Sequence, residues 1–497
     1  MNQRQLNEKI LFGLKVKHLR LQRQLNFADF AKQTGMSVSY LNEIEKGKKY
    51  PKPDKLKLIA GALAVPEEEL LHPETDKHLQ PVVELLNSNF LSELPLDLFE
   101  IDLTKVVEII ANAPLKVGAF ISTLVELARN YALAEEHFYL GALRSYVELH
   151  NNYFEDLEQA AQEFIKAHGL EQSEKIRVYN LENLLKEEYG YTIVENGLKD
   201  MPELKGVRSV FIPKKKKLLL AEGLTDVQKA FQFGKELGFN YLKLKERAYT
   251  SNLLRINSFE EVLNHFKASY FSCAILINQE SFVSDMRFFF SLPQWEPAKL
   301  QLLLHKYLAS SEMIFQRMTN VLPRFFGLDK LFLLRFVHRP SNGDFKLDTE
   351  LHFSIQHQPH SNALYEHYCR RWLSVALLAD LQQLQKEGKG SGELLGVQRS
   401  RFLKTQEEYL CFTVARKAFP DEDKNVSITV GILNDETLKK NVAFVNDNRI
   451  PFRVVNTTCE RCSLEDCQER AAPPTVVAER KKRKATLMAL EKLLKES

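Results

Sequence analysis

Three cysteines near the carboxyl end of the chain have the spacing of a metal-binding loop. Cys459, Cys462 and Cys467 form a C-x2-C-x4-C pattern. Because thiolates two residues apart can reach one metal from a tight turn, this pattern indicates metal ligation. Three sulfurs leave tetrahedral zinc or a four-iron cluster one ligand short, and Cys369 is the candidate fourth ligand. The alternative is that these thiols stay reduced and hold no metal.

The other two cysteines and the amino-terminal residues indicate in which cellular compartment the protein is expected. Cys273 and Cys411 stand among apolar neighbours and are expected to be small buried residues. The first ten residues lack the apolar stretch of a secretion signal, so we expect a cytoplasmic protein with reduced thiols. No apolar run reaches the ~18–20 residues of a membrane span, so no membrane partner is expected.

The stretch Phe27–Gly47 (FADFAKQTGMSVSYLNEIEKG) predicts a helix-turn-helix. Apolar residues at helical spacing flank Gly35, where the chain can turn in a left-handed conformation. Ser37 can cap the second helix, which is expected to run to Lys46. In such motifs the second helix enters the DNA major groove with its amino-terminal residues at base edges. An ordinary helical hairpin in a core is the alternative.

This placement selects the candidate DNA-contacting residues. Ser37 would begin the helix in the groove; the base readers would be Val38, Ser39, Tyr40, Asn42 and Glu43, and the phosphate contacts Lys46, Lys48 and Lys49. Up to Lys57 the chain has 13 Lys and Arg against 5 acidic residues, a net +8, whereas the whole chain carries +3. Phosphate neutralisation needs such a local basic excess.

Residues 10–72 resemble the DNA-binding unit of the XRE family of bacterial repressors. The motifs that carry this resemblance are GLKVKHLR at Gly13–Arg20, the FADFAKQTGMS core, YLNEIEKGKKYPKP at Tyr40–Pro53 and LKLIAGALAVPEEELL at Leu56–Leu71. The resemblance implies an all-α domain of five helices that binds a double-stranded DNA operator. Repressors of this type read two half-sites, which favours a homodimer.

The length predicts a multidomain protein of about three domains. We expect the DNA-binding domain in residues 1–74, a helical connector in 75–168, an α+β domain in 169–330, an α+β sensing domain in 331–478 and a basic helix in 479–497. The connector either packs on its neighbours or forms a dimer interface. The sensing domain is expected to be GAF- or PAS-like. The terminal helix can dock on the body or contact DNA, and we expect docking.

A helix expected at Thr225–Lys245 carries FQFGKELGF at Phe231–Phe239. It resembles the FxxxHELGH helix of ImmA/IrrE-type metallopeptidases, which bears two zinc-binding histidines and a glutamate base. Glu236 is kept, but Lys235 and Phe239 occupy the two histidine positions. Neither side chain ligates zinc, so we expect a degenerate peptidase-like domain that is not an enzyme. His265 or Lys267 aligns with the family's third ligand, and His265 is expected to be structural.

Other segments predict the elements around these sites. YGYTIVE (Tyr189–Glu195) reads as a strand, and Val207–Gly223 reads as a hairpin turning at Pro213–Lys217. Helices are expected over Ser258–Phe282 and through 283–330, where a phenylalanine-rich segment forms either core or the wall of an apolar pocket. In the last third, FLLRFVH, KLDTELHFSIQH, EYLCFTVARK and VSITVGIL predict strands. Tyr368–Gln385 predicts the helix that would bring in Cys369.

The cysteine loop, with the preceding domains, resembles the short-chain fatty acyl transcriptional regulators, which include mycobacterial regulators of propionate and glyoxylate metabolism. The residues that carry this resemblance are Cys459, Cys462, Cys467, Arg470, Ala471, Pro473 and Pro474. It implies an acyl-CoA effector and a [4Fe-4S] cluster. Zinc is the alternative metal, because His352, His357, His360 and His367 lie nearby in the sequence.

The expected function is therefore a sequence-specific DNA-binding transcriptional regulator that senses a small-molecule metabolite. A short-chain acyl-CoA is the expected effector, with Arg370 and Arg371 available for its phosphates. One alternative is a metallopeptidase-type stress regulator that cleaves a partner repressor. Another is a regulator that senses zinc or the redox state.

Overall fold

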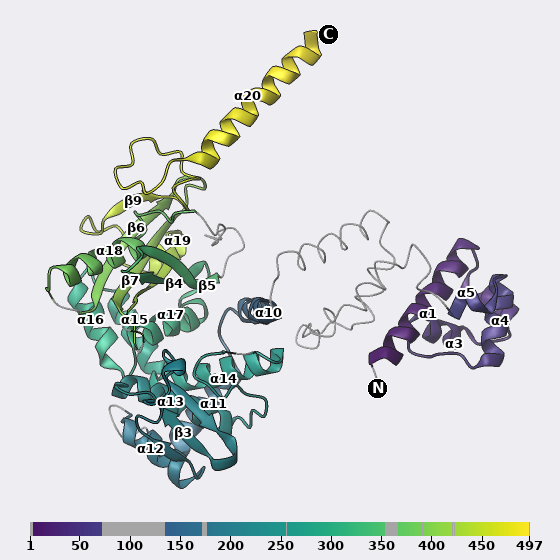
Figure 1. Ribbon diagram of the computed structural model, residues 1–497, viewed down its shortest axis with the longest axis horizontal. Coiled ribbons are helices and arrows are strands. Elements are labelled where there is room, and N and C mark those ends of the chain that lie inside the picture. Colours follow the sequence, from purple (N-terminus) through teal and green to yellow (C-terminus); the bar gives the residue numbers. More distant parts are fainter. Residues whose placement is uncertain are drawn as a thin grey trace. The chain divides into compact units, whose positions relative to one another are not determined.

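The computed structural model describes residues 3–71, 135–170, 176–254, 256–352, 366–389, 392–419, 421 and 423–496 (Figure 1). The chain divides into two compact units, Met1–Tyr146 with Ile256–Phe259, and Val147–Arg255 with Glu260–Ser497. Residues 75–134 of the expected connector lie outside the described residues, as do His357, His360 and the His352 side chain. Among the helices that are described, none is long and apolar enough to cross a membrane.

Five helices form the amino-terminal domain, as predicted. They are α1 (Gln3–Gln22), α2 (Phe27–Thr34), α3 (Val38–Glu45), α4 (Pro53–Leu63) and α5 (Glu67–Leu71). Gly35 ends α2 with a φ of 67°, in the left-handed region that suits glycine. The Ser37 hydroxyl caps α3 by accepting a hydrogen bond from the Tyr40 N–H at 3.2 Å. The predicted turn and cap are therefore confirmed.

The first helix packs closely against the second helix of the motif. A Cβ atom on Gly13 would lie 2.3 Å from the carbonyl oxygen of Ile44, so only glycine permits this approach. Arg20 forms a buried two-pronged ion pair with Glu45, with Nε–Oε1 at 2.6 Å and Nη2–Oε2 at 3.0 Å. These contacts fix α3 on α1, while Leu41 and Ile44 bury the inner face of α3.

The first part of the second unit is a small sheet among helices. Its strands are β1 (Thr192–Val194), β2 (Ser209–Ile212) and β3 (Lys217–Leu220), in the order β1-β3-β2. The helices of this part are α11 (Glu155–Ala167), α12 (Val178–Glu187), α13 (Asp226–Tyr241), α14 (Phe259–Leu276), α15 (Gln279–Phe290), α16 (Pro297–Lys306) and α17 (Ser311–Phe326). Helix α10 (Glu135–Leu149) spans the boundary between the two units. The hairpin turn at residues 213–217 is confirmed, with Lys216 left-handed. The helix expected over Ser258–Phe282 is instead two helices, because Asn278 caps α15.

A six-stranded sheet forms the core of the last part of the chain. Its strands are β4 (Leu331–Arg339), β5 (Asp344–His352), β6 (Leu394–Phe402), β7 (Glu408–Lys417), β8 (Asn425–Leu433) and β9 (Phe452–Val455), in the order β5-β4-β8-β7-β6-β9. Among the described strands of this sheet, β6 and β9 pair in parallel and the other neighbours are antiparallel. Helix α18 (Leu373–Lys386) packs on the sheet, and α19 (Glu436–Asn441) follows β8. The GAF- or PAS-like class remains a prediction.

Two expectations need correction here, and one pair of alternatives is resolved. The helix expected from Tyr368 begins at Leu373, because Tyr368 forms a β-bridge with Thr458. In the phenylalanine-rich segment, the two alternatives apply to different residues: Phe289, Phe290 and Phe315 are buried in the core, whereas Leu304 and Met313 line a cavity. The terminal helix α20 (Thr475–Glu496) does not dock on the body, because its residues 478–495 are all exposed.

Candidate functional site

The second helix of the motif, α3, presents the candidate DNA-contacting residues outward. Ser37, Val38 and Ser39 are exposed at its amino end, and Tyr40, Asn42 and Glu43 are partly exposed along it. Val38 is an apolar residue that is 46% exposed, which suits contact with a base edge better than contact with water. The lysines beyond the helix, Lys46, Lys48 and Lys49, are exposed as well.

Two of the candidate DNA-contacting residues, Glu43 and Lys49, form an ion pair with each other. Lys49 Nζ lies 2.6 Å from Glu43 Oε2, and this hydrogen bond raises the pKa of Lys49. Because both side chains are exposed, the pair is worth little and DNA phosphates can compete for the lysine. Lys55 Nζ lies 4.6 Å from the Tyr40 ring centroid, so a further cation of the basic excess stands beside the candidate base readers.

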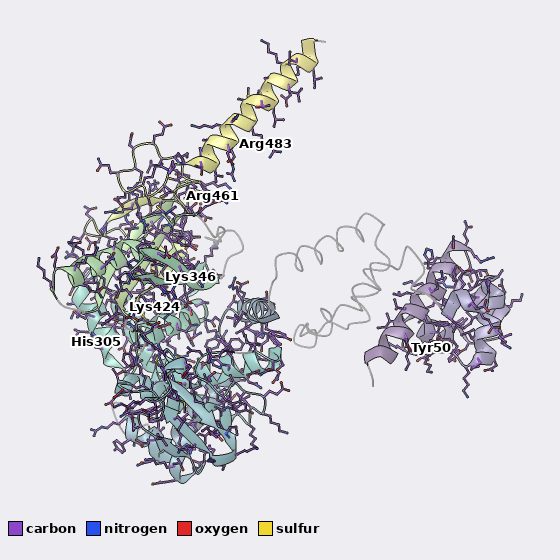
Figure 2. All side chains as sticks on the ribbon, in the orientation of Figure 1. Tyr50, His305, Lys346, Lys424, Arg461 and Arg483 are labelled. Carbon is purple, nitrogen blue, oxygen red and sulfur yellow. The ribbon has the colours of Figure 1, made fainter. Side chains whose placement is uncertain are left out.

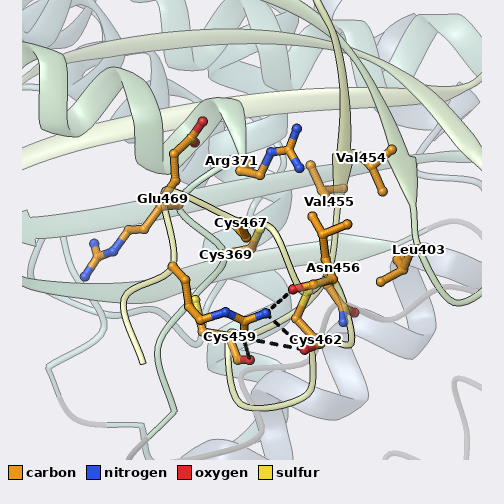
Figure 3. Close-up of a pocket in the computed structure, with 13 residues that line it drawn as sticks. Cys369, Arg371, Leu403, Val454, Val455, Asn456, Cys459, Cys462, Cys467 and Glu469 are labelled. Atoms are coloured by element: carbon orange, nitrogen blue, oxygen red, sulfur yellow. Dashed lines mark hydrogen bonds between the residues drawn. The ribbon is translucent and has the colours of Figure 1, made fainter. Parts of the chain in front are cut away.

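The four predicted metal-binding cysteines line one small pocket in the second unit. Cys369, Cys459 and Cys462 are buried, and Cys467 is half-buried (Figure 3). Cys369 arrives on the segment before α18, where its N–H donates to the carbonyl of Thr457 at 3.2 Å. The enclosed space is about 10 Å³, close to the volume needed for one water or one ion.

Backbone and arginine contacts hold the cysteine loop in place. The Arg470 guanidinium donates to the carbonyl of Cys459 at 3.0 Å and to the carbonyls of Cys462 and Leu464 (Figure 3, dashed lines). The Ala471 N–H lies 3.3 Å from the sulfur of Cys459 and can donate to it. Such a donor stabilises sulfur in its thiolate form, which is the form that binds metal.

The electrostatics of this pocket suit a bound cation. Burial raises the pKa of Cys369, and the nearby sulfurs of Cys459 and Cys462 raise it further. Thiolates crowded in this way repel one another unless a positive ion lies between them. Arg370 and Arg371 line the pocket and can offset the net negative charge of a metal with four thiolates. The donor set therefore fits a thiolate-bound metal.

Among the described residues, no three His, Cys, Asp or Glu side chains are already arranged with the geometry needed to bind a metal ion. His367 does not line the cysteine pocket, and its Nδ1 lies 2.7 Å from Oε1 of Glu460. A metal would therefore have to draw the four sulfurs together, with His367 engaged elsewhere.

The helix that resembles a peptidase helix is engaged in its own buried contacts. On α13, Glu236 accepts hydrogen bonds from Arg247 at 2.6 Å and from the Tyr191 hydroxyl at 3.0 Å. The Arg247 guanidinium also lies 3.9 Å from the ring centroid of Phe239. A glutamate held by an ion pair and a second hydrogen bond is poorly placed to activate a water molecule.

A large cavity of about 730 Å³ lies in the second unit, between α13, α14 and α17 and the edge of the last domain. Its apolar lining includes Phe231, Phe266 and Met313, and its basic lining includes Arg208 and Arg416. Arg208 is partly buried, its Nη2 donates to the carbonyl of Phe419 at 3.2 Å, and its Nε is enclosed by protein without a hydrogen-bond partner. Arg370 and Arg371, expected at an effector site, line the cysteine pocket instead.

Comparison with known proteins identifies the amino-terminal domain. Residues 16–70 match the family model described as Helix-turn-helix, so this part of the chain is a helix-turn-helix DNA-binding domain. A solved structure of a Mycobacterium tuberculosis transcriptional regulator is similar at 16% identity and a TM-score of 0.44, over 66% of this chain and 92% of that one. Among curated proteins, none matches the chain.

Proposed function

We propose that the chain is a transcriptional regulator whose second unit senses a small anionic metabolite and passes the signal to the helix-turn-helix domain. The observation that carries the regulatory part is the match of residues 16–70 together with the outward-facing α3. A DNA-binding domain joined to a unit with a large ligand-sized cavity has the two distinct sites that allosteric control requires.

The cavity supports an acyl-CoA as the effector class. Its volume of about 730 Å³ lies within the range of small-molecule sites, about 300–1,000 Å³. Phe231, Phe266 and Met313 offer an apolar surface for an acyl chain. Arg208 and Arg416 offer donors for phosphate oxygens, and a phosphate would compete for Arg416 with its present partner on the cavity wall, Glu312, at 3.6 Å. This combination of an apolar wall and two guanidinium groups is the chemistry that the resemblance to acyl-dependent regulators led us to expect.

The cysteine pocket supports a second input through one thiolate-bound metal centre. Cys369, Cys459, Cys462 and Cys467 would hold it, and the family resemblance favours a four-iron cluster. Zinc is the second candidate, because the space between the side chains has the size of one ion. When bound, the metal would cross-link the cysteine loop to the segment before α18.

Calorimetry of the full chain with acetyl-, propionyl- and longer acyl-CoAs tests the effector. We expect binding that Arg416→Gln weakens by roughly 10–100-fold, the effect of removing one charge-assisted hydrogen bond. The matched control is Arg371→Gln, which removes a cation at the cysteine pocket and should leave the affinity unchanged. Absence of heat and of any thermal shift with every acyl-CoA would remove this effector class.

A further inference from the structure

The carboxyl-terminal helix α20 carries a dense run of exposed cations. Arg480, Lys481, Lys482, Arg483 and Lys484 are consecutive, and we call them the basic segment. All five side chains are exposed (Figure 2, where Arg483 is labelled). Within the described part of the chain, no carboxylate forms an ion pair with the four residues from Lys481 to Lys484. Their charge is therefore available to a partner.

The distribution of these cations around the helix is informative. Consecutive residues of an α-helix are about 100° apart, so five in succession surround the axis. A helix that lies on a membrane surface keeps its cations on one polar face. A helix in the DNA major groove instead meets phosphates on both walls, as the continuous basic helices of dimeric DNA-binding proteins do. The basic segment fits the groove better than the flat surface.

The start of α20 is tied to the cysteine loop. The Val477 N–H donates to the carbonyl of Glu460 at 3.4 Å, and Pro473 and Pro474 lead directly into the helix. Arg480 lies near enough to Glu366 to lower the pKa of that carboxyl, whose main ion-pair partner is Arg461 of the same loop. The first turn of α20 is therefore held by the cysteine loop, and the rest of the helix is exposed. The whole helix of 22 residues is about 33 Å long.

We infer that the basic segment of α20 is a second DNA-binding element, which contacts phosphates of the duplex outside the bases read by α3. The inference builds on the DNA binding of the helix-turn-helix domain and adds a contact from the opposite end of the chain. Charge complementarity carries it: α20 contains seven Lys and Arg residues against three Glu, and its five adjacent cations match the charge density of DNA. Phosphate contacts add affinity without adding base preference.

The carboxyl half of α20 does not favour a second copy of the chain as the partner. Leu487, Leu490 and Leu494 have coiled-coil spacing and are at least 50% exposed. They span only about one heptad, whereas stable coiled coils sustain the pattern over three or four. A dimer through this helix would also bring two basic segments together, and their mutual repulsion would oppose it unless DNA lay between them.

The test compares two full-length triple variants with equal loss of charge. The first changes Lys481, Lys482 and Lys484 to Gln; the matched control changes Lys214, Lys215 and Lys217 of the β2–β3 hairpin to Gln. Binding is measured on a duplex selected by the wild-type protein from random sequences and on a scrambled duplex, over a series of salt concentrations. Circular dichroism checks the helix content, and a Lys→Arg version of the first variant checks that charge is the cause.

We expect the α20 variant to bind both duplexes at least tenfold more weakly, with the salt slope reduced by up to about 2.7 for three lost phosphate contacts. The hairpin and Lys→Arg variants should bind like the wild type. Equal binding by both Gln variants, with the wild type still binding DNA, would overturn the inference and leave the helix-turn-helix function intact. So would unchanged DNA binding with lost binding to phosphatidylserine vesicles or lost dimerisation. Failure of the wild type to bind any DNA would overturn the regulatory proposal itself.

Discussion

The ammonium nitrogen of Lys235 lies 3.1 Å from Nε2 of His265, inside the second unit. Burial lowers the pKa of Lys235 to about 7, and burial together with Lys235 lowers the pKa of His265 well below its usual value. Lys235 also lies 3.3 Å from the carbonyl oxygen of Ser251. A lysine and a histidine thus meet at positions that the sequence resemblance aligned with zinc ligands, and their hydrogen bond uses the imidazole nitrogen that would otherwise face a metal.

The stability of the second unit should depend on pH through Lys235. Its folded pKa of about 7 lies below its ordinary value of 10.5, so between these values the unfolded chain binds more protons and stability rises with pH. The slope for one such lysine is about 1.4 kcal/mol per pH unit. Lys235→Met should flatten the pH 7–10 slope of the free energy of unfolding by that amount. Chemical denaturation at several pH values measures it, with the exposed Lys245→Met as control; equal slopes in both variants would contradict the lowered pKa of Lys235.

Glu236 should behave as a structural residue rather than as a catalytic base. Its partner Arg247 is buried, so Glu236→Gln leaves a guanidinium without its counter-charge and should destabilise the unit by roughly 3 kcal/mol. Tyr191→Phe removes a hydroxyl that donates to the same carboxylate and accepts from Asn240, and it should cost about 2 kcal/mol because the counter-charge of Arg247 stays in place. Thermal unfolding and a zinc-supplemented proteolysis assay check this. Proteolysis that disappears in a normally folded Glu236→Gln chain would restore the enzyme hypothesis.

Local structure was predictable from the sequence at positions where a residue type strongly favours one conformation or one capping role. Gly35 adopts the left-handed conformation, Ser37 caps α3, and the hairpin turns at residues 213–217. Strand β6 was missed because it does not look like a strand. It contains Gly396, where a Cβ would lie 3.0 Å from Leu377 of α18, and its polar Gln398 and Ser400 are buried. The close packing of α18 on β6 is a tertiary contact, and the residue pattern of β6 alone does not reveal it.

The cysteine pocket should bind one metal centre per chain, either four irons of a cluster or one zinc ion. Replacement of Cys459 or Cys369 by Ser should abolish stoichiometric metal, since each removes one of four ligands. Cys411→Ser is the matched control, because Cys411 is buried in β7 outside this pocket. Elemental analysis and visible absorption of anaerobically purified chains separate iron from zinc. Equal metal content in the Cys369 and Cys411 variants would mean that this ligand set is wrong.

The sequence allowed us to predict which four cysteines line the pocket, but not how the chain brings Cys369 to the other three. A helix beginning at Tyr368 was expected to carry Cys369, whereas the structure places Cys369 on an extended segment paired with the loop itself. A β-bridge between residues about ninety positions apart has no signature in either segment alone. The large cavity was equally hidden, because its lining comes from four helices and from residues at or just beyond the end of β7, such as Arg416 and Phe419.

The measurement that tests the central claim most directly is selection of duplexes from random DNA by the full-length protein, followed by footprinting. We predict one preferred sequence. Changing Lys46, Lys48 and Lys49 to Gln should weaken binding to every sequence and flatten the salt dependence, because these exposed lysines would meet phosphates. Ser39→Ala should instead change the selected bases. Recovery of no sequence preference and no footprint with the folded wild-type chain would contradict the assignment of this protein as a DNA-binding regulator.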